Sequence, residues 1–254
     1  MRGESYMNQG LGNRTYEITR IKGEKMMNNA IILQYLSELE KNNDRAWYHA
    51  HKDMLHSATE QFENVTQALI FEIGKADAGI IHNEAKDLTF KLVRDTRYSH
   101  DKSPYNPAFR AHIGAGGKQP IPVGYYVYIS PGNKSFLGGG LFADIFKDAT
   151  NMIRDYISAN PEEWNEIIQA DTFNSLFSVK GTVLKNVPPG YDINHPCAEY
   201  IKNKSWYLEY PVSDELVLDA DAFIDEAVRV FMEMKPFNDY LNRALYGFAM
   251  PKHK

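Results

Sequence analysis

The chain has 254 residues, of which 43% are hydrophobic and 24% are charged, a composition typical of an ordinary globular protein. Its formal net charge of -5 argues against a general duplex-binding protein, which usually carries a basic surplus. No apolar run approaches the roughly 20 residues that span a bilayer, and the amino terminus lacks the pattern of a secretory signal. A single cysteine, Cys197, excludes an internal disulfide framework. These features together predict a cytoplasmic protein without a membrane-spanning segment.

Hydrophobic periodicity predicts helices at both ends of the chain. Residues 1–27 are polar and aperiodic, so we interpret them as a disordered or loosely docked leader before a single globular domain over residues 28–250. Apolar residues then recur at three- and four-residue steps, which predicts one helix from about Asn29 to Asn42 and a second from Arg45 to Ile73. Further helices are expected over residues 144–159, 161–168, 195–201 and 219–245, the last one bent or broken at Pro236.

The middle of the chain predicts strands. Residues 123–129 are β-branched or aromatic almost throughout, and a Ser-Pro-Gly-Asn turn leads into residues 134–141, which should pair with them as a hairpin. The three glycines at 138–140 weaken that second strand, so they indicate either a bulge or a backbone or ligand that approaches closely. Residues 105–122 are expected to form a long irregular connection.

The charged segment from Lys91 to Tyr105 concentrates more chemistry than any other stretch. Taken as a strand over residues 88–99, it places Arg94 in the same row as Phe90 and Leu92. A guanidinium keeps its proton, so in such a row it needs a carboxylate, backbone carbonyl groups or a bound anion. A structural ion pair and a ligand site both satisfy this requirement.

This segment resembles the hallmark, approximately RxxRDxRFxxxKxxY, of a bacterial family catalogued as domain of unknown function 2461. The matching residues are Arg94, Asp95, Arg97, Lys102 and Tyr105, while Lys91 stands in place of the first arginine and Tyr98 in place of the phenylalanine. The likeness extends from about Ile31 to Leu245 and includes the Gly-Tyr-Tyr of residues 124–126 and the Pro-Gly-Tyr-Asp of residues 189–192. The resemblance implies a single-domain bacterial protein without an assigned activity.

The main functional hypothesis is a site that binds an anionic small molecule, because several fixed cations near glycine-rich backbone suit a phosphate or carboxylate group. The candidate ligand-binding residues are Arg94, Asp95, Arg97, Lys102, Tyr105, Gly139, Lys185 and Lys204. The sequence assigns no catalytic residue, metal-ligand set or cofactor. Cys197 near His195 suggests a thiol and its base, but sequence neighbours rarely hold that geometry.

Two other hypotheses stay open. One is a nucleic-acid or protein interaction module, in which Trp206, Tyr207 and Tyr210 stack beside a basic strip. The other is a charge cluster that only stabilises the fold. For the architecture, we predict an α+β fold with a mostly antiparallel central sheet packed by helices from both chain ends. Its strands are expected at residues 88–99, 123–129, 134–141, 179–184 and 205–210.

Overall fold

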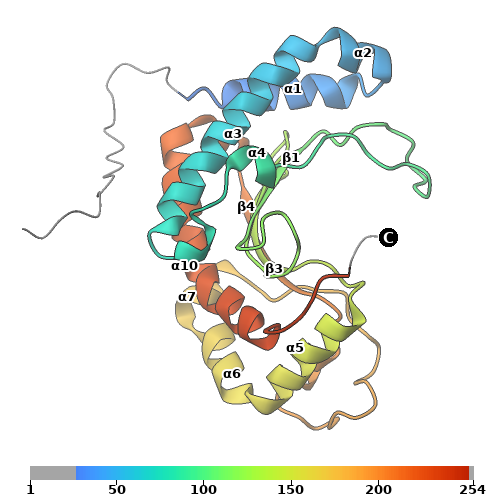
Figure 1. The fold of residues 1–254 in the computed structure, drawn as a ribbon, viewed down its shortest axis with the longest axis vertical. Coiled ribbons are helices and arrows are strands. Elements are labelled where there is room, and N and C mark those ends of the chain that lie inside the picture. Colours follow the sequence, from blue (N-terminus) through green and yellow to red (C-terminus); the bar gives the residue numbers. More distant parts are fainter. Residues whose placement is uncertain (1–26, 252–254) are drawn as a thin grey trace, which may run out of the picture.

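The computed structural model describes residues 27–251 and has the predicted α+β architecture (Figure 1). Its sheet has four antiparallel strands that lie in chain order. They are β1 (Phe109–Ile113), β2 (Tyr125–Ile129), β3 (Ser135–Leu141) and β4 (Trp206–Val212). The antiparallel hairpin of β2 and β3 is confirmed. The predicted leader, apart from Met27, lies outside the described residues.

The helices from both chain ends form where the apolar period predicts them. α1 (Ala30–Lys41) is as expected, but the second predicted helix is two, α2 (Arg45–Ala50) and α3 (Lys52–Gly74), with a break at His51. α10 (Ala220–Ala244) continues through Pro236 and is not broken there. The remaining helices are η1 (Ala78–Ile80), α4 (Ala85–Leu88), α5 (Lys147–Ala159), α6 (Pro161–Gln169), α7 (Asp171–Leu176), α8 (Ala198–Ile201) and α9 (Asp214–Leu218).

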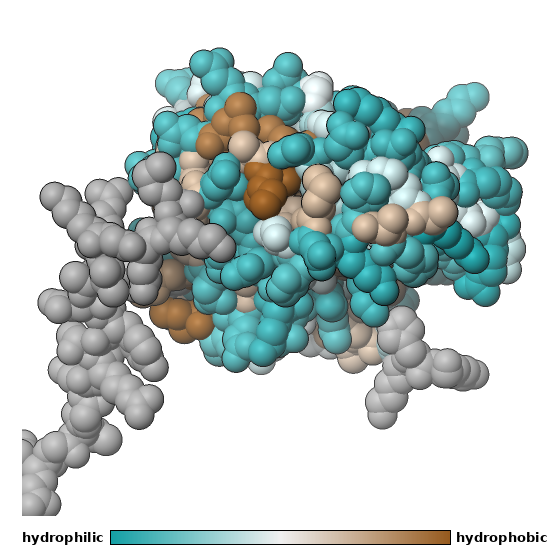
Figure 2. Space-filling view, turned by 90° about the horizontal axis from the view of Figure 1, so that it is seen from above, coloured by the Kyte–Doolittle hydropathy of each residue, from teal (hydrophilic) through white to brown (hydrophobic). Residues whose placement is uncertain are grey.

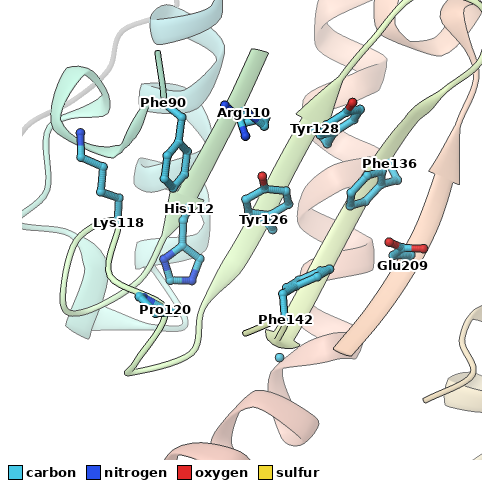
Figure 3. A pocket seen from close by; sticks show the side chains of 11 residues that line it. Phe90, Arg110, His112, Lys118, Pro120, Tyr126, Tyr128, Phe136, Phe142 and Glu209 are labelled. Carbon is cyan, nitrogen blue, oxygen red and sulfur yellow. The ribbon is translucent and has the colours of Figure 1, made fainter. Parts of the chain in front are cut away.

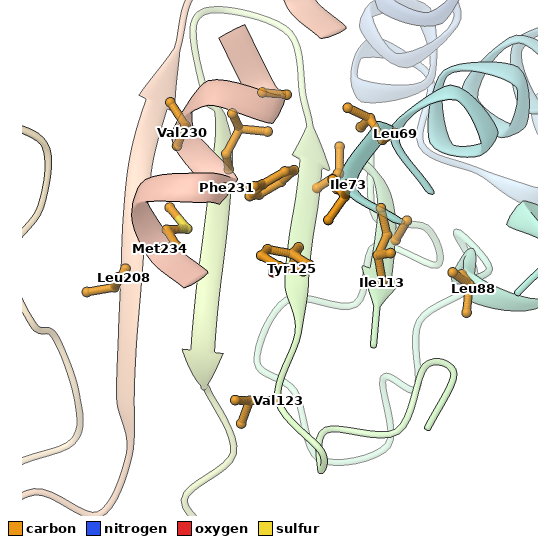
Figure 4. Close-up of a cluster of buried hydrophobic side chains, with 14 of the residues drawn as sticks. Leu69, Ile73, Leu88, Ile113, Val123, Tyr125, Leu208, Val230, Phe231 and Met234 are labelled. Carbon is orange, nitrogen blue, oxygen red and sulfur yellow. The ribbon is translucent and has the colours of Figure 1, made fainter. Parts of the chain in front are cut away.

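Helices α3 and α10 cover one face of the sheet and form the core with it (Figures 1 and 4). Alternate residues of each strand point into this layer, because successive side chains of a strand face opposite ways. Tyr125 and Leu208 are almost completely buried there, on the side of the sheet where Phe231 and Met234 of α10 lie (Figure 4). The opposite face of the sheet has no such helical layer in the described part of the chain.

The three glycines of β3 let other parts of the protein approach the sheet closely. A Cβ atom at Gly139 would lie 3.0 Å from Oδ1 of Asn238 and 3.1 Å from Sδ of Met234, both on α10. Gly140 has a φ of +87°, a left-handed conformation that disfavours other residues. The lack of side chains at these glycines therefore lets α10 pack closely against the sheet.

Two predicted strands are wrong. Residues 88–99 form no continuous strand: Leu88 ends α4, and only Thr89 and Val93 make single bridges, to Ala111 and Tyr105. Residues 179–184 likewise make only single bridges, at Lys180 and Val183. In their place β1 completes the sheet, within the stretch expected to be an irregular connection.

The charged segment instead forms an arm, residues 93–105, that reaches away from the sheet (Figure 1). Its two sides are joined at the base by hydrogen bonds from Arg94 N to Pro104 O (2.9 Å) and from Asn106 N to Leu92 O (2.7 Å). Asn43 holds the base, because its side chain bonds both the N–H and the carbonyl group of Tyr105. Farther along the arm, its charged side chains form ion pairs with one another. The chain therefore turns back instead of extending along the sheet.

None of the described helices, within residues 27–251, is both long and apolar enough to cross a membrane.

The end of the molecule where α1 and α2 lie has a mostly hydrophilic surface, with hydrophobic residues gathered in a small area (Figure 2).

Candidate functional site on the open face of the sheet

The face of the sheet that α3 and α10 leave uncovered is called the open face here. β1 contributes Arg110 and His112 to it, and β2 contributes Tyr126 and Tyr128 (Figure 3). The antiparallel register places Arg110 opposite Tyr128 and His112 opposite Tyr126, and it places Phe136 of β3 beside Tyr128. Across the three strands, one row of side chains thus places the Arg110 cation next to the aromatic rings of Tyr128 and Phe136.

Aromatic side chains line a pocket of about 400 Å³ on the open face, called the aromatic pocket below. The rings of Tyr128 and Phe136 stack with 4.8 Å between centroids, and the ring of Phe142 lies 5.3 Å from that of Tyr126. Phe142 also stacks on Tyr207 of β4 at 4.4 Å. Offset aromatic contacts of this kind present flat apolar surface to a bound ring.

Arg110 is the cation of the aromatic pocket. Its Cζ atom lies 5.5 Å from the centroid of the Phe90 ring, and Nη2 donates to the carbonyl oxygen of Lys91 (3.1 Å). Its Nε–H group is buried without a hydrogen-bond partner, and no carboxylate of residues 27–251 forms an ion pair with it. A buried donor without an acceptor costs about 1–3 kcal/mol. An anion in the pocket would lie beside the rest of this guanidinium, because Arg110 lines the pocket.

The other polar groups leave a positive balance in the aromatic pocket. Burial lowers the pKa of His112 to about 4, although the carbonyl groups of Gly117 and Gln119 oppose that change, so the ring is neutral near pH 7. Lys118 donates to the carbonyl oxygen of Thr89 (3.3 Å). Glu209, the carboxylate of the pocket lining, already pairs with Lys180 at 2.8 Å.

Burial also changes the acidity of Tyr126, whose ring lies at the centre of the aromatic pocket (Figure 3). It raises the pKa of the phenol, while the nearby Arg110 guanidinium acts in the opposite direction. The phenol therefore stays protonated near neutral pH and can donate a hydrogen bond.

Four of the predicted site residues lie together on the arm. Arg94 pairs with Asp101, and the Nη2 atom of Arg97 lies 2.6 Å from Oδ2 of Asp95. Lys102 donates to the carbonyl oxygen of Thr96. The side chains of Arg97 and Asp95 are 76% and 57% exposed, so this pair faces solvent. Its guanidinium lowers the pKa of Asp95 to about 2.

The other four predicted residues are separated from these charges. Tyr105 is buried at the base of the arm, where its ring stacks on Tyr48 at 3.9 Å. Gly139 faces α10 on the covered side of the sheet. Lys204 lies 3.5 Å from Asp144, and Lys185 is exposed on a neighbouring segment. The structure does not bring Gly139, Lys185 or Lys204 to the arm or into the aromatic pocket.

The structure also places the residues of the interaction-module hypothesis and of the suggested Cys197–His195 pair. Trp206 is buried and donates to the carbonyl oxygen of Tyr200, and the hydroxyl of Tyr210 donates to Glu226. Of the three residues predicted to stack on bases, Tyr207 alone lies on the open face. Burial raises the pKa of the Cys197 thiol. Nδ1 of His195 accepts from the backbone N–H of Cys197, not from its thiol.

The sequence reasoning missed Arg110, His112 and the aromatic pocket. The signal was present, because Phe109, Ala111 and Ile113 alternate with these two polar residues as in a half-buried strand. The glycine and proline residues after Ile113 concealed it by making the whole stretch resemble a loop.

A model of the family described as "Conserved hypothetical protein (DUF2461)" matches residues 31–240. No curated protein and no solved structure matches the chain significantly. Within residues 27–251, no group of three or more His, Cys, Asp or Glu side chains has the arrangement of a metal site.

Proposed function

Since the chain belongs to the family of domain of unknown function 2461, whose description assigns no activity, we propose a function from the chemistry of the open face. The protein binds a small molecule that carries a flat ring and an anionic group, a phosphate or a carboxylate. The ring lies among the aromatic side chains of the aromatic pocket, and the anionic group is held by Arg110.

The single observation that carries this proposal is the Arg110 guanidinium. It lines the pocket, it has no carboxylate partner in the described part of the chain, and its Nε–H lacks an acceptor. A planar oxyanion can accept two parallel hydrogen bonds from such a group. Arg110 is half-buried and donates to one backbone carbonyl group, so its charge is not neutralised within the described residues and an external anion is a suitable partner for it.

The rest of the lining supports a ring-bearing ligand. Ligand pockets are largely apolar and hold a few placed polar groups, and this one combines aromatic rings with Arg110, Lys118 and a neutral His112. Its concave shape and volume of about 400 Å³ suit one small molecule. A single-stranded nucleic acid would require a longer basic strip along the sheet, whereas the pocket lining includes the carboxylate of Glu209.

The sequence-based proposal that the arm holds the anion is tested together with this one. The arm cations already have partners within the arm, because Arg94 pairs with Asp101 and Arg97 with Asp95. Arg110 has no such partner in the described residues, so it is the better candidate. Arg97→Gln and Arg110→Gln each remove one guanidinium and are therefore matched variants.

The experiment measures binding of 4-methylumbelliferyl phosphate, a flat two-ring coumarin that carries a phosphate, by isothermal titration calorimetry. Arg110→Gln should weaken binding about 10- to 100-fold, the loss expected for a hydrogen bond to a charged group. Arg97→Gln should bind as the wild type does. Binding that Arg97→Gln abolishes and Arg110→Gln spares would move the site to the arm. No binding by the wild type would refute the proposal.

A further inference from the structure

A second cavity of about 310 Å³ adjoins the aromatic pocket. It lies between α3 and the segment before the arm, and Leu55, Thr59 and Phe62 of α3 form part of its wall. Phe90 and Lys118 line both cavities, so the two cavities are neighbours. We call this cavity the second pocket.

Two cations, Arg110 and Lys118, lie where the two pockets adjoin. Arg110 packs against the Phe90 ring and donates to the carbonyl oxygen of Lys91, which lines the second pocket. Lys118 lines both pockets. In the described part of the chain, neither lysine forms an ion pair. Any group that crosses from one pocket to the other therefore passes positive charges that no carboxylate of the described residues pairs with.

The second pocket itself has an apolar wall and a basic rim. Leu55, Phe62 and Phe109 supply apolar surface, and Glu63 is the one carboxylate among its described lining residues, against three lysines. Lys86, the third lysine, pairs with Glu84. Such a lining suits an uncharged, apolar portion of a ligand whose charge remains at the rim.

We infer that the ligand has two organic parts joined through an anionic phosphate diester. One flat ring occupies the aromatic pocket, the second part occupies the second pocket, and the phosphate lies at the boundary near Arg110, Lys118 and Lys91. A carboxylate ends a chain, whereas a phosphate diester keeps a negative charge while bonded to two groups. This inference rests on the proposed function, because the ring and the anion use the same groups there.

The test compares two probes by calorimetry. 4-Methylumbelliferyl phosphate carries one coumarin group, and bis(4-methylumbelliferyl) phosphate carries two such groups on one phosphate diester. The wild type should bind the diester probe about tenfold more tightly or better, since burying a second coumarin adds apolar contact. Thr59→Trp, which places a large side chain in the second pocket, should remove this advantage and leave the affinity for the monoester probe unchanged.

Glu60→Trp is the matched control, because Glu60 is an exposed neighbour on α3 that lines neither pocket. It should keep the advantage of the diester probe. Equal affinities of the wild type for both probes, or an advantage that survives Thr59→Trp, would overturn the inference while binding of the monoester still supports the proposed function. Failure of both probes to bind would refute the proposed function itself.

Discussion

His112 should make the folded protein less stable in mild acid. Its pKa is lowered from 6.5 to about 4 by burial, so the unfolded chain takes up a proton before the folded protein does as the pH falls. The stability from a neutral His112 is therefore fully present above pH 6.5 and is lost between pH 6.5 and 4. From these two pKa values, the unfolding free energy should fall by about 2 kcal/mol between pH 7 and pH 5.

The assay is urea unfolding of the wild type and of His112→Gln at pH 7 and at pH 5, followed by circular dichroism. Glutamine is neutral at both values and can still donate to the carbonyl oxygen of Gly117, which lies 3.2 Å from Nδ1 of His112. Other titrating groups affect both proteins equally, so the difference between their losses isolates His112. Equal losses of stability in the two proteins would refute the reasoning.

Three further tests address the packing and the arm. Gly190→Ala should lower the unfolding free energy by about 1–2 kcal/mol, because the φ of Gly190 is +97° although a Cβ atom there would meet nothing within 4 Å. Gly140→Ala should lower it further in the same urea assay, because a Cβ atom there would also collide with β4. Asn242→Ala removes both hydrogen bonds to the backbone of Val123, at 2.8 and 3.0 Å, and should lower the unfolding free energy by about 2–3 kcal/mol; a change within error would contradict the role of this clamp. Arg97→Gln should leave the urea midpoint unchanged because its ion pair is exposed, and a large drop would favour a structural role for the arm charges.

The arm illustrates where local sequence reasoning fails. Alternation of apolar and charged residues suggests a strand, but the partners of Arg94 and Arg97 lie seven and two residues away. Such short-range ion pairs form without a neighbouring strand, and the chain turns back on itself. The residue pattern around Arg97 does identify a charge cluster, but it does not reveal where that cluster lies relative to the sheet.

The candidate pocket illustrates the opposite case, in which each part is visible in the sequence and the assembly is not. Tyr126, Tyr128 and Phe136 fall on one face of predicted strands by simple alternation. Their relation to Arg110 depends on β1, which the loop-like composition conceals. The lack of a carboxylate partner for Arg110 within residues 27–251 depends on every residue nearby in space, and periodicity carries no such information.

The sequence by itself determined the helices at both ends, the central antiparallel hairpin and the family, because apolar period, turn residues and motifs are local properties of the chain. The tertiary structure decided which face of the sheet α3 and α10 cover, where the charged segment lies, and that Arg110 lines the aromatic pocket without a carboxylate partner among the described residues. These depend on contacts between residues far apart in the sequence, such as Asn242 with Val123, and on the exclusion of water by the whole fold.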